Sequence, residues 1–131
     1  MTAQAQALPT NAAQTLVSTA LNIMEKWSCS EKEKMALLGV GRSTLHKYQV
    51  APSSARLSPD LMERISYLLN IHAILRTLFE NPENIYGFLR MPNTSRFFSG
   101  KAPMELLSSG LMSSLYEVHL HLDGLRDGQF A

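Results

Sequence analysis

Apolar positions along the chain recur every three or four residues, and this spacing predicts a protein built from α-helices. A first helix is predicted over residues 11–26 and a long one over residues 59–79. The apolar stripe of the long helix consists of Leu61, Ile65, Leu68, His72, Leu75 and Phe79. The last helix has the same pattern at Leu111, Leu115, Val118, Leu122 and Leu125. No segment alternates in the manner of a strand, so we expect an all-α fold of about seven helices.

Residues that begin or end helices divide the rest of the chain into shorter elements. Ser30 begins a helix through a capping box with the glutamate three residues later. Gly39 can adopt the left-handed backbone that ends this helix, and the next helix is predicted over residues 42–49. Further helices are expected after the cap residue Asn81 and over residues 104–107.

The two helices on either side of Gly39 have the layout of a helix-turn-helix. Leu45 and Tyr48 continue the apolar pattern of the second helix and leave it a polar outer face. The polar residues of this face are Arg42, Ser43, Thr44, His46 and Lys47. Arginine can pair with guanine, and the other side chains can hold phosphates or bases, so this face is the candidate DNA-binding site. The alternative is the solvated face of an ordinary helical hairpin, because Met35 stands where a small residue is frequent and Gly41 where Ser or Thr would cap better.

The composition is that of one compact protein, or of two small subdomains that share a core. The 131 residues are 45% hydrophobic and 18% charged, which is ordinary for a soluble domain. A single cysteine excludes an internal disulfide framework and favours the reducing cytoplasm. Residues 1–10 contain no positive charge and no apolar run, so we expect a flexible arm and no membrane association.

Charge is unevenly distributed along the chain. Residues 1–58 carry six basic and three acidic side chains, a balance of +3, whereas residues 59–131 carry six basic and eight acidic ones, a balance of −2. No acidic residue lies between Lys34 and Pro59, a stretch whose basic residues are Lys34, Arg42, Lys47 and Arg56. A phosphate-facing surface has this character, although an ordinary fluctuation of charge along a short chain is the alternative.

Other combinations of reactive side chains do not make a plausible catalytic or metal site. His119 and His121 are two residues apart, which on a helix directs them about 200° from each other. His72 lies on an apolar stripe and is predicted to be a core or interface histidine with a hydrogen-bonded ring. Cys29 and His46 lack a third group to orient them. Without a glycine-rich phosphate loop or a metal-spaced cluster, we expect no enzymatic activity, no cofactor and no metal.

The last helix has more apolar surface than one buried stripe requires. Its other faces carry a mixed aromatic and apolar set, Met112, Tyr116, His119, Leu120 and Arg126. Such a set suits a partner surface, although ordinary packing is the default. The chain then ends in "DGLRDGQFA", which is either a mobile tail or a segment that orders on a partner.

As a whole, the sequence resembles the Xre/MbcA/ParS antitoxins, which pair with RES-type toxins that consume or use NAD. The resemblance runs from about Met24 to Gly128 through "MEKWSCSEKEKMALLGVGRSTLHKY", "LSPDLMERISYLLNIHAILRTLF", "FLRMPNTSRFFSGKAPMELLSSG" and "LHLDGLRDG". Its most specific residues follow the family's order and spacing: Leu89-Arg90, Pro92-Asn93, Phe98, Gly100, Pro103, Leu106-Leu107 and Gly110. The sequence departs from the family at Ala102, where a capping Ser or Thr is frequent, and at Ser99 and Lys101, where a second glycine is common.

The resemblance implies a two-part antitoxin that follows the arm. Residues 11–58 would form an Xre-like helix-turn-helix domain that binds DNA and represses the operon. Residues 59–131 would form a helical toxin-binding and dimerisation domain, entered by the long helix 59–79. The last helix and the tail would enter the NAD cleft of the toxin, with Arg126 and Asp127 at the polar end of the helix and Gly128 closing it.

The expected toxin-binding residues are Tyr116, His119, Leu120, Asp123, Arg126 and Asp127. The expected partners are a RES-domain toxin, operator DNA and a second copy of the chain, with higher association when the toxin is present. The alternative is a stand-alone helix-turn-helix transcriptional regulator whose helical second half only dimerises.

Overall fold

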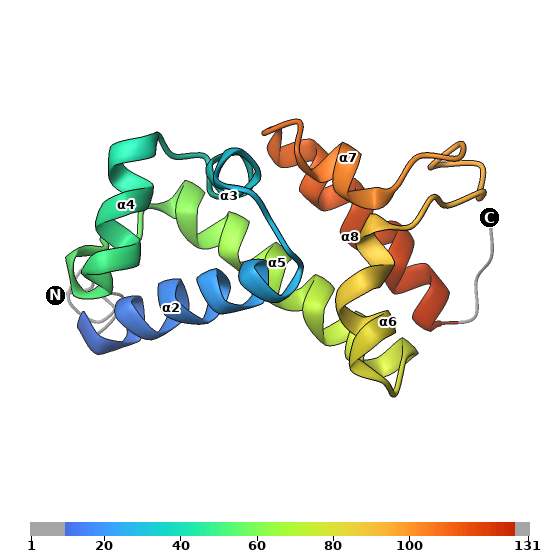
Figure 1. Cartoon of the computed structure of the whole chain (residues 1–131), viewed down its shortest axis with the longest axis horizontal. Coiled ribbons are helices and arrows are strands. Elements are labelled where there is room, and N and C mark those ends of the chain that lie inside the picture. Colours follow the sequence, from blue (N-terminus) through green and yellow to red (C-terminus); the bar gives the residue numbers. More distant parts are fainter. Residues whose placement is uncertain (1–9, 128–131) are drawn as a thin grey trace, which may run out of the picture.

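A computed structural model describes residues 10–127, and this part of the chain consists of seven α-helices and two short 3-10 helices (Figure 1). The first half contains α2 (Thr10–Lys26), α3 (Glu31–Leu38), α4 (Arg42–Val50) and the 3-10 helix η1 (Pro52–Ser54). Then follow α5 (Pro59–Leu78), α6 (Pro82–Gly87), the 3-10 helix η2 (Phe88–Arg90), α7 (Pro103–Leu107) and α8 (Met112–Arg126). The described residues include no strand, so the all-α prediction is confirmed.

Side-chain caps set the starts of the helices where the sequence predicts them. Ser58 accepts a hydrogen bond from the backbone N–H of Leu61 at 3.1 Å, and Asn81 accepts one from that of Asn84 at 2.8 Å. A proline follows each of these caps at the first helical position, where a missing N–H removes no helical hydrogen bond. The arm predicted over residues 1–10 lies outside the described residues except for Thr10, which begins α2 instead.

The long helix α5 connects the two halves of the molecule (Figure 1). Its first half lies against α2 and α3, and α8 packs along it from the other side. Helix α4 lies at one end of the molecule, whereas α6 and the end of α8 lie at the opposite end. The two candidate sites therefore lie on different parts of the surface and are joined through α5.

One continuous hydrophobic core extends through both halves. It includes Met24 from α2, Leu45 from α4, Leu68 from α5, Leu107 from α7 and Leu115 from α8, each at most 1% exposed. Such close packing of side chains from helices far apart in the sequence makes the halves depend on each other for stability. A shared core was one of the two arrangements that the composition allowed.

Helix α5 is buried over more than the single stripe that its sequence predicts. Ile71 and Ile74 are buried beside the stripe, and so is the charged Arg64. Two members of the predicted stripe, His72 and Phe79, are only half-buried. The prediction was too narrow because α5 has helices packed on both sides. No helix within residues 10–127 is long and apolar enough to span a membrane.

Candidate functional site

The turn between α3 and α4 has the geometry that its sequence predicts. Ser30 accepts a hydrogen bond from the N–H of Glu33 at 3.1 Å, and Glu33 accepts one from the N–H of Ser30 at 2.9 Å, so the capping box is complete. Gly39 ends α3 in the left-handed region with φ of 67°. Gly41 precedes α4 in extended conformation and provides no side-chain cap, as expected.

Gly39 is required for space as well as for its backbone conformation. A Cβ atom at this position would come within 2.7 Å of Nε of Arg64 and 2.8 Å of its Cζ. Any other residue would therefore combine a strained backbone with a collision against a buried guanidinium. The tight connection between the two helices depends on this glycine.

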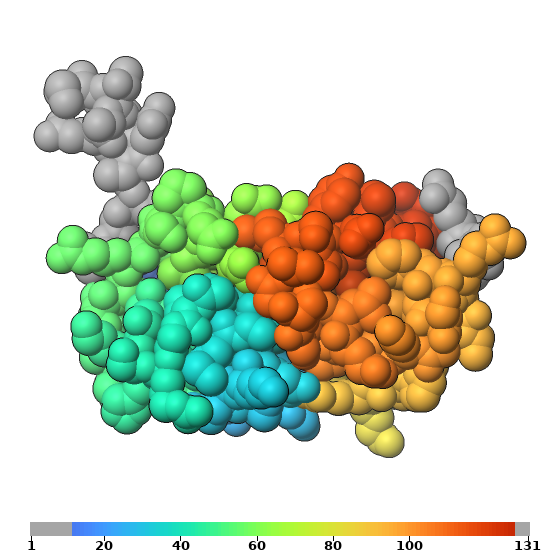
Figure 2. Space-filling view, turned by 90° about the horizontal axis from the view of Figure 1, so that it is seen from above, coloured from blue at the N-terminus to red at the C-terminus, as the bar shows by residue number. Residues whose placement is uncertain are grey.

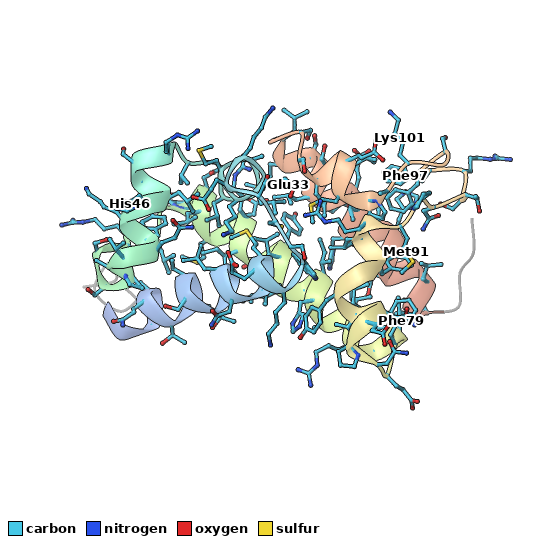
Figure 3. The ribbon with its side chains drawn as sticks, viewed as in Figure 1. Glu33, His46, Phe79, Met91, Phe97 and Lys101 are labelled. Carbon is cyan, nitrogen blue, oxygen red and sulfur yellow. The ribbon has the colours of Figure 1, made fainter. Side chains whose placement is uncertain are left out.

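The outer face of α4 carries the predicted DNA-binding residues. Arg42, Ser43, His46 and Lys47 are exposed, while Leu45 and Tyr48 are buried beneath them. Figure 3 shows His46 pointing away from the body of the protein. Thr44, the fifth predicted residue, is half-buried at the edge of this face.

Lys34, one of the basic residues in the acid-free stretch, does not contribute to a basic surface. Its ammonium group is buried and forms ion pairs with Glu25 and, at 3.3 Å, with Glu31. Burial alone would lower the pKa of Lys34, but its hydrogen bonds to the two carboxylates raise the pKa above its usual value. The exposed positive charges of this stretch are thus Arg42, Lys47 and Arg56.

The outer face of α8 presents large apolar side chains to the solvent. Tyr116 is 48% exposed and Leu120 is 51% exposed, and the nearby His119 is half-buried. The rings of Tyr116 and His119 lie 6.2 and 5.6 Å from that of Tyr67 on α5. We call the surface formed by these four residues the α8 face. Sequence reasoning missed Tyr67, because only the fold brings α5 against this side of α8.

The polar end of α8 is internally paired. Arg126 forms an ion pair with Asp123, with 2.5 Å between its Nη2 and a carboxylate oxygen, and its Nε lies 4.0 Å from a carboxylate oxygen of Asp127. Asp123 is half-buried, while Arg126 and Asp127 are exposed. The structure thus brings the three polar residues of the predicted site together. The rest of the predicted tail, from Gly128 onward, lies outside the described residues.

The loop between η2 and α7 accommodates both departures from the family pattern. Ser99 adopts φ of 51° and Gly100 φ of 86°, so a serine takes the left-handed conformation beside the loop glycine. Ala102 begins α7 without a side-chain cap, and its N–H donates to the carboxylate of Glu105 at 2.9 Å. Phe97 from this loop, labelled in Figure 3, stacks on His121 of α8 with 3.8 Å between ring centroids.

The remaining reactive side chains do not assemble into a catalytic site. Burial raises the pKa of Cys29 to about 11, which keeps the thiol protonated at neutral pH, and His46 points into the solvent from α4. His119 contacts Tyr67 and His121 contacts Phe97, so the two histidines face different neighbours. Within the described residues, no three His, Cys, Asp or Glu side chains are placed to hold a metal ion.

His72 has the satisfied ring that the sequence predicts. Its Nε2 lies 3.3 Å from the hydroxyl of Tyr86, and the two rings stack with centroids 5.7 Å apart. Burial lowers the pKa of His72, and the positive charges of Arg76 and Lys26 add to this effect. This histidine therefore has a structural role between α5 and α6.

Comparison with known proteins gives two family matches that together cover nearly the whole chain. Residues 2–70 match a family described as the antitoxin Xre-like helix-turn-helix domain. Residues 75–128 match one described as the antitoxin Xre/MbcA/ParS C-terminal toxin-binding domain. An uncharacterized protein of Sinorhizobium fredii (strain NBRC 101917 / NGR234), y4oB, is 35% identical over 107 residues, which cover 81% of this chain and 80% of the relative.

Proposed function

The chain belongs to the Xre/MbcA/ParS antitoxin family, and we propose that it neutralises a RES-domain toxin by blocking the toxin's NAD cleft. Membership supplies the two roles, since one matched region is of the DNA-binding helix-turn-helix type and the other of the toxin-binding type. Neither of these families is a family of enzymes. The identity of the toxin, the mode of blockade and the residues involved are our proposal.

For the DNA-binding role, we assign operator recognition to the outer face of α4, within a unit of residues 11–58. Arg42 and Lys47 are exposed there and have no acidic neighbour in the sequence from residue 35 to residue 58. The positive charge supports phosphate binding, while the adjacent Ser43 and His46 can reach base edges. Through this face the protein would repress its own operon in the cytoplasm.

For the toxin-binding role, we assign the binding energy to the α8 face, within a unit of residues 59–131. The exposure of Tyr116 and Leu120 is the observation that carries the proposal, because large apolar side chains at the centre of an interface contribute most of its affinity. Full burial of one such side chain contributes about 1.5–3 kcal/mol. His119 and Tyr67 would form the aromatic surroundings of this contact.

For the blockade itself, we assign the polar end of α8 and the tail that follows. An NAD cleft must attract phosphates and ribose hydroxyls, so a segment bearing Arg126 and Asp127 could occupy it and imitate those contacts. The ion pair of Arg126 with Asp123 does not oppose this, because exposed ion pairs contribute only about 0–1 kcal/mol and exchange easily. Inhibition would be steric and competitive with NAD.

Deletion of residues 126–131 tests this division of roles. The truncated chain should still form a complex with the RES-domain protein encoded beside it, but the NAD turnover of that protein should largely return. The double variant Tyr116→Asp/Leu120→Asp should instead lose the complex, because it places charges in the apolar contact. Arg96→Ala, which changes an exposed arginine away from the α8 face, serves as the control.

Two outcomes would contradict the proposal. If the truncated chain inhibits as well as the full-length chain, the tail plays no part in the blockade. If no RES-domain gene adjoins this one and no RES-domain protein binds the chain, the proposed toxin class is wrong.

A further inference from the structure

An arginine from the toxin-binding region binds both the turn that precedes α3 and the first turn of α3. Nε and Nη2 of Arg90 donate to the backbone carbonyls of Trp27 and Ser28 at 3.1 and 3.0 Å, beyond the end of α2. The guanidinium also binds the carboxylate of Glu33 in α3 through two hydrogen bonds, at 2.8 and 2.6 Å. These bonds lower the pKa of Glu33, so the pair is fully charged at neutral pH. A bidentate pair of this kind fixes geometry as well as distance.

A second arginine, on the connecting helix α5, also links the helix-turn-helix to the segment before α8. Arg64 of α5 is 8% exposed and lies in the matched helix-turn-helix region. Its Nη1 donates to the carbonyl of Ala36 near the end of α3 at 3.1 Å, and its Nη2 donates to the carbonyl of Gly110 before α8 at 3.0 Å. Asp60 accepts from its Nε at 3.0 Å and balances the buried charge.

The two arginines therefore hold α3 at opposite ends. Arg90 binds Glu33 in the first turn of α3, and Arg64 binds the carbonyl of Ala36 in its last turn and lies against Gly39. In Figure 2 the surface of α3, in cyan, lies directly against the orange surface of the α7–α8 segment. Since α4 follows α3 through a tight turn at Gly39 and packs against it, a shift of α3 would also shift α4.

We propose that Arg64 and Arg90 are positioning residues that fix the DNA-binding helix α4 relative to the toxin-binding region, so that the two functions are coupled. This inference rests on the proposed role of α4 in DNA binding. A change at the α7–α8 turn would be transmitted through the Gly110 carbonyl to Arg64, and from there to α3 and α4. The coupling needs only short hydrogen bonds between groups that the core already holds in place.

The full-length variant Arg90→Lys tests the proposal with two measurements. Lysine keeps the charge but cannot make the four hydrogen bonds of the planar guanidinium. Hydrogen exchange of the α3 and α4 amides should become roughly tenfold faster, while the exchange of α8 stays unchanged. Affinity for the DNA duplex directly upstream of the gene should fall severalfold, although Arg90 does not lie on the α4 face.

A double-mutant cycle separates positioning from simple loss of stability. Lys47→Ala should weaken DNA binding less in the Arg90→Lys background than in the wild type, because a misplaced α4 has already lost part of that contact. A purely structural role would leave the effect of Lys47→Ala unchanged in the folded protein. Arg96→Lys is the matched control, an exposed arginine in the same region.

The outcomes are distinguishable from failure of the proposed function. If the wild-type chain does not bind the upstream duplex, the operator assignment is wrong, and the exchange rates of α4 alone decide the positioning role. Unchanged exchange in α3 and α4 of Arg90→Lys, or strictly additive effects in the cycle, would overturn the proposal. Arg64→Lys should likewise speed hydrogen exchange in the last turn of α3. Unchanged exchange there in Arg64→Lys would also overturn the proposal.

Discussion

Arg42 and Lys47 have the same charge on α4 but different expected roles in DNA binding. Loss of a base-pairing arginine costs about 1–3 kcal/mol and relaxes sequence preference, whereas loss of a phosphate contact weakens binding to every sequence alike. We expect Arg42→Ala to reduce operator affinity by the first route, because arginine pairs with guanine in two ways. Lys47→Ala should reduce operator affinity through the loss of a phosphate contact. The slope of log affinity against log salt concentration should then become shallower by about one.

These expectations are measured as binding isotherms on operator and random duplexes over a series of salt concentrations. Circular dichroism confirms that both variants remain folded, and Arg96→Ala controls for the loss of one positive charge from the surface. If both α4 variants bind the operator as tightly as the wild type at fixed salt, the recognition-helix assignment is wrong.

His72 makes the stability of the fold depend on pH in a known direction. Burial lowers the pKa of His72 in the folded chain. Near and below pH 6.5 the unfolded chain therefore binds more protons than the folded chain, and the free energy of unfolding rises with pH. The stabilisation is present above the ordinary pKa of 6.5 and is lost as the pH falls below it. The free energy of unfolding should therefore decrease as the pH falls below 6.5, the pKa of an ordinary histidine.

His72→Gln should flatten this decrease, because the amide can still bond to the hydroxyl of Tyr86 but does not titrate. Urea unfolding at a series of pH values measures the slope, and His46→Gln is the control at an exposed position on α4. A slope in His72→Gln that equals that of the wild type would assign the pH dependence to another group.

At the scale of the elements, the start of α7 is a position where the residue common in the family, Ser or Thr in place of Ala102, should stabilise the fold. Ala102 has the extended backbone of a helix cap, and Glu105 already accepts from its N–H, so half of a capping box is present. Ala102→Ser should add the missing hydroxyl acceptor and raise the free energy of unfolding by about 1 kcal/mol. Denaturant unfolding measures the gain.

Ala73→Ser is the matched control for this prediction, because it places the same hydroxyl on an exposed position within α5. There a serine has no free N–H to cap and should lower stability slightly. Equal effects of the two substitutions would mean that α7 gains nothing from a cap at its first turn.

The sequence predicted the helices well because their ends are determined locally. Ser58, Asn81 and Gly39 act on backbone groups within four residues of themselves, so a reader of the sequence can identify them. The two 3-10 helices were missed, since short tightened turns have no apolar period of their own. The burial of Lys34 was also missed, because its partners Glu25 and Glu31 neutralise it only when α2 and α3 lie side by side.

For the candidate site, the sequence predicted its two helices but not what surrounds them. The outer faces of α4 and α8 follow from helical periodicity alone. Tyr67 joined the α8 face, and Arg64 and Arg90 were found to hold α3, only once the fold had placed residues distant in the sequence beside them. Contacts between residues far apart in the sequence depend on how the helices pack, and a periodic pattern of apolar residues does not specify that packing.

At the scale of the whole molecule, the assembly expected from the sequence stays a prediction. A helix-turn-helix reads one half-site, so a symmetric operator requires two copies of the chain with their recognition helices about 34 Å apart. Much of the apolar stripe of α5 is not available for such a contact, since Leu61, Ile65 and Leu68 are buried in the core of the chain itself.

We predict a homodimer without toxin and further association when the toxin is present. Light scattering should give twice the 14.6 kDa mass of one chain at micromolar concentration, and a monomer under those conditions would contradict the prediction. Tyr116→Asp separates the proposed antitoxin from a regulator whose second half only dimerises. If the α8 face binds the toxin, this variant stays dimeric and loses the toxin complex. If the variant becomes monomeric, the α8 face is the dimer interface, and the exposed Tyr116 and Leu120 no longer support toxin binding at that face.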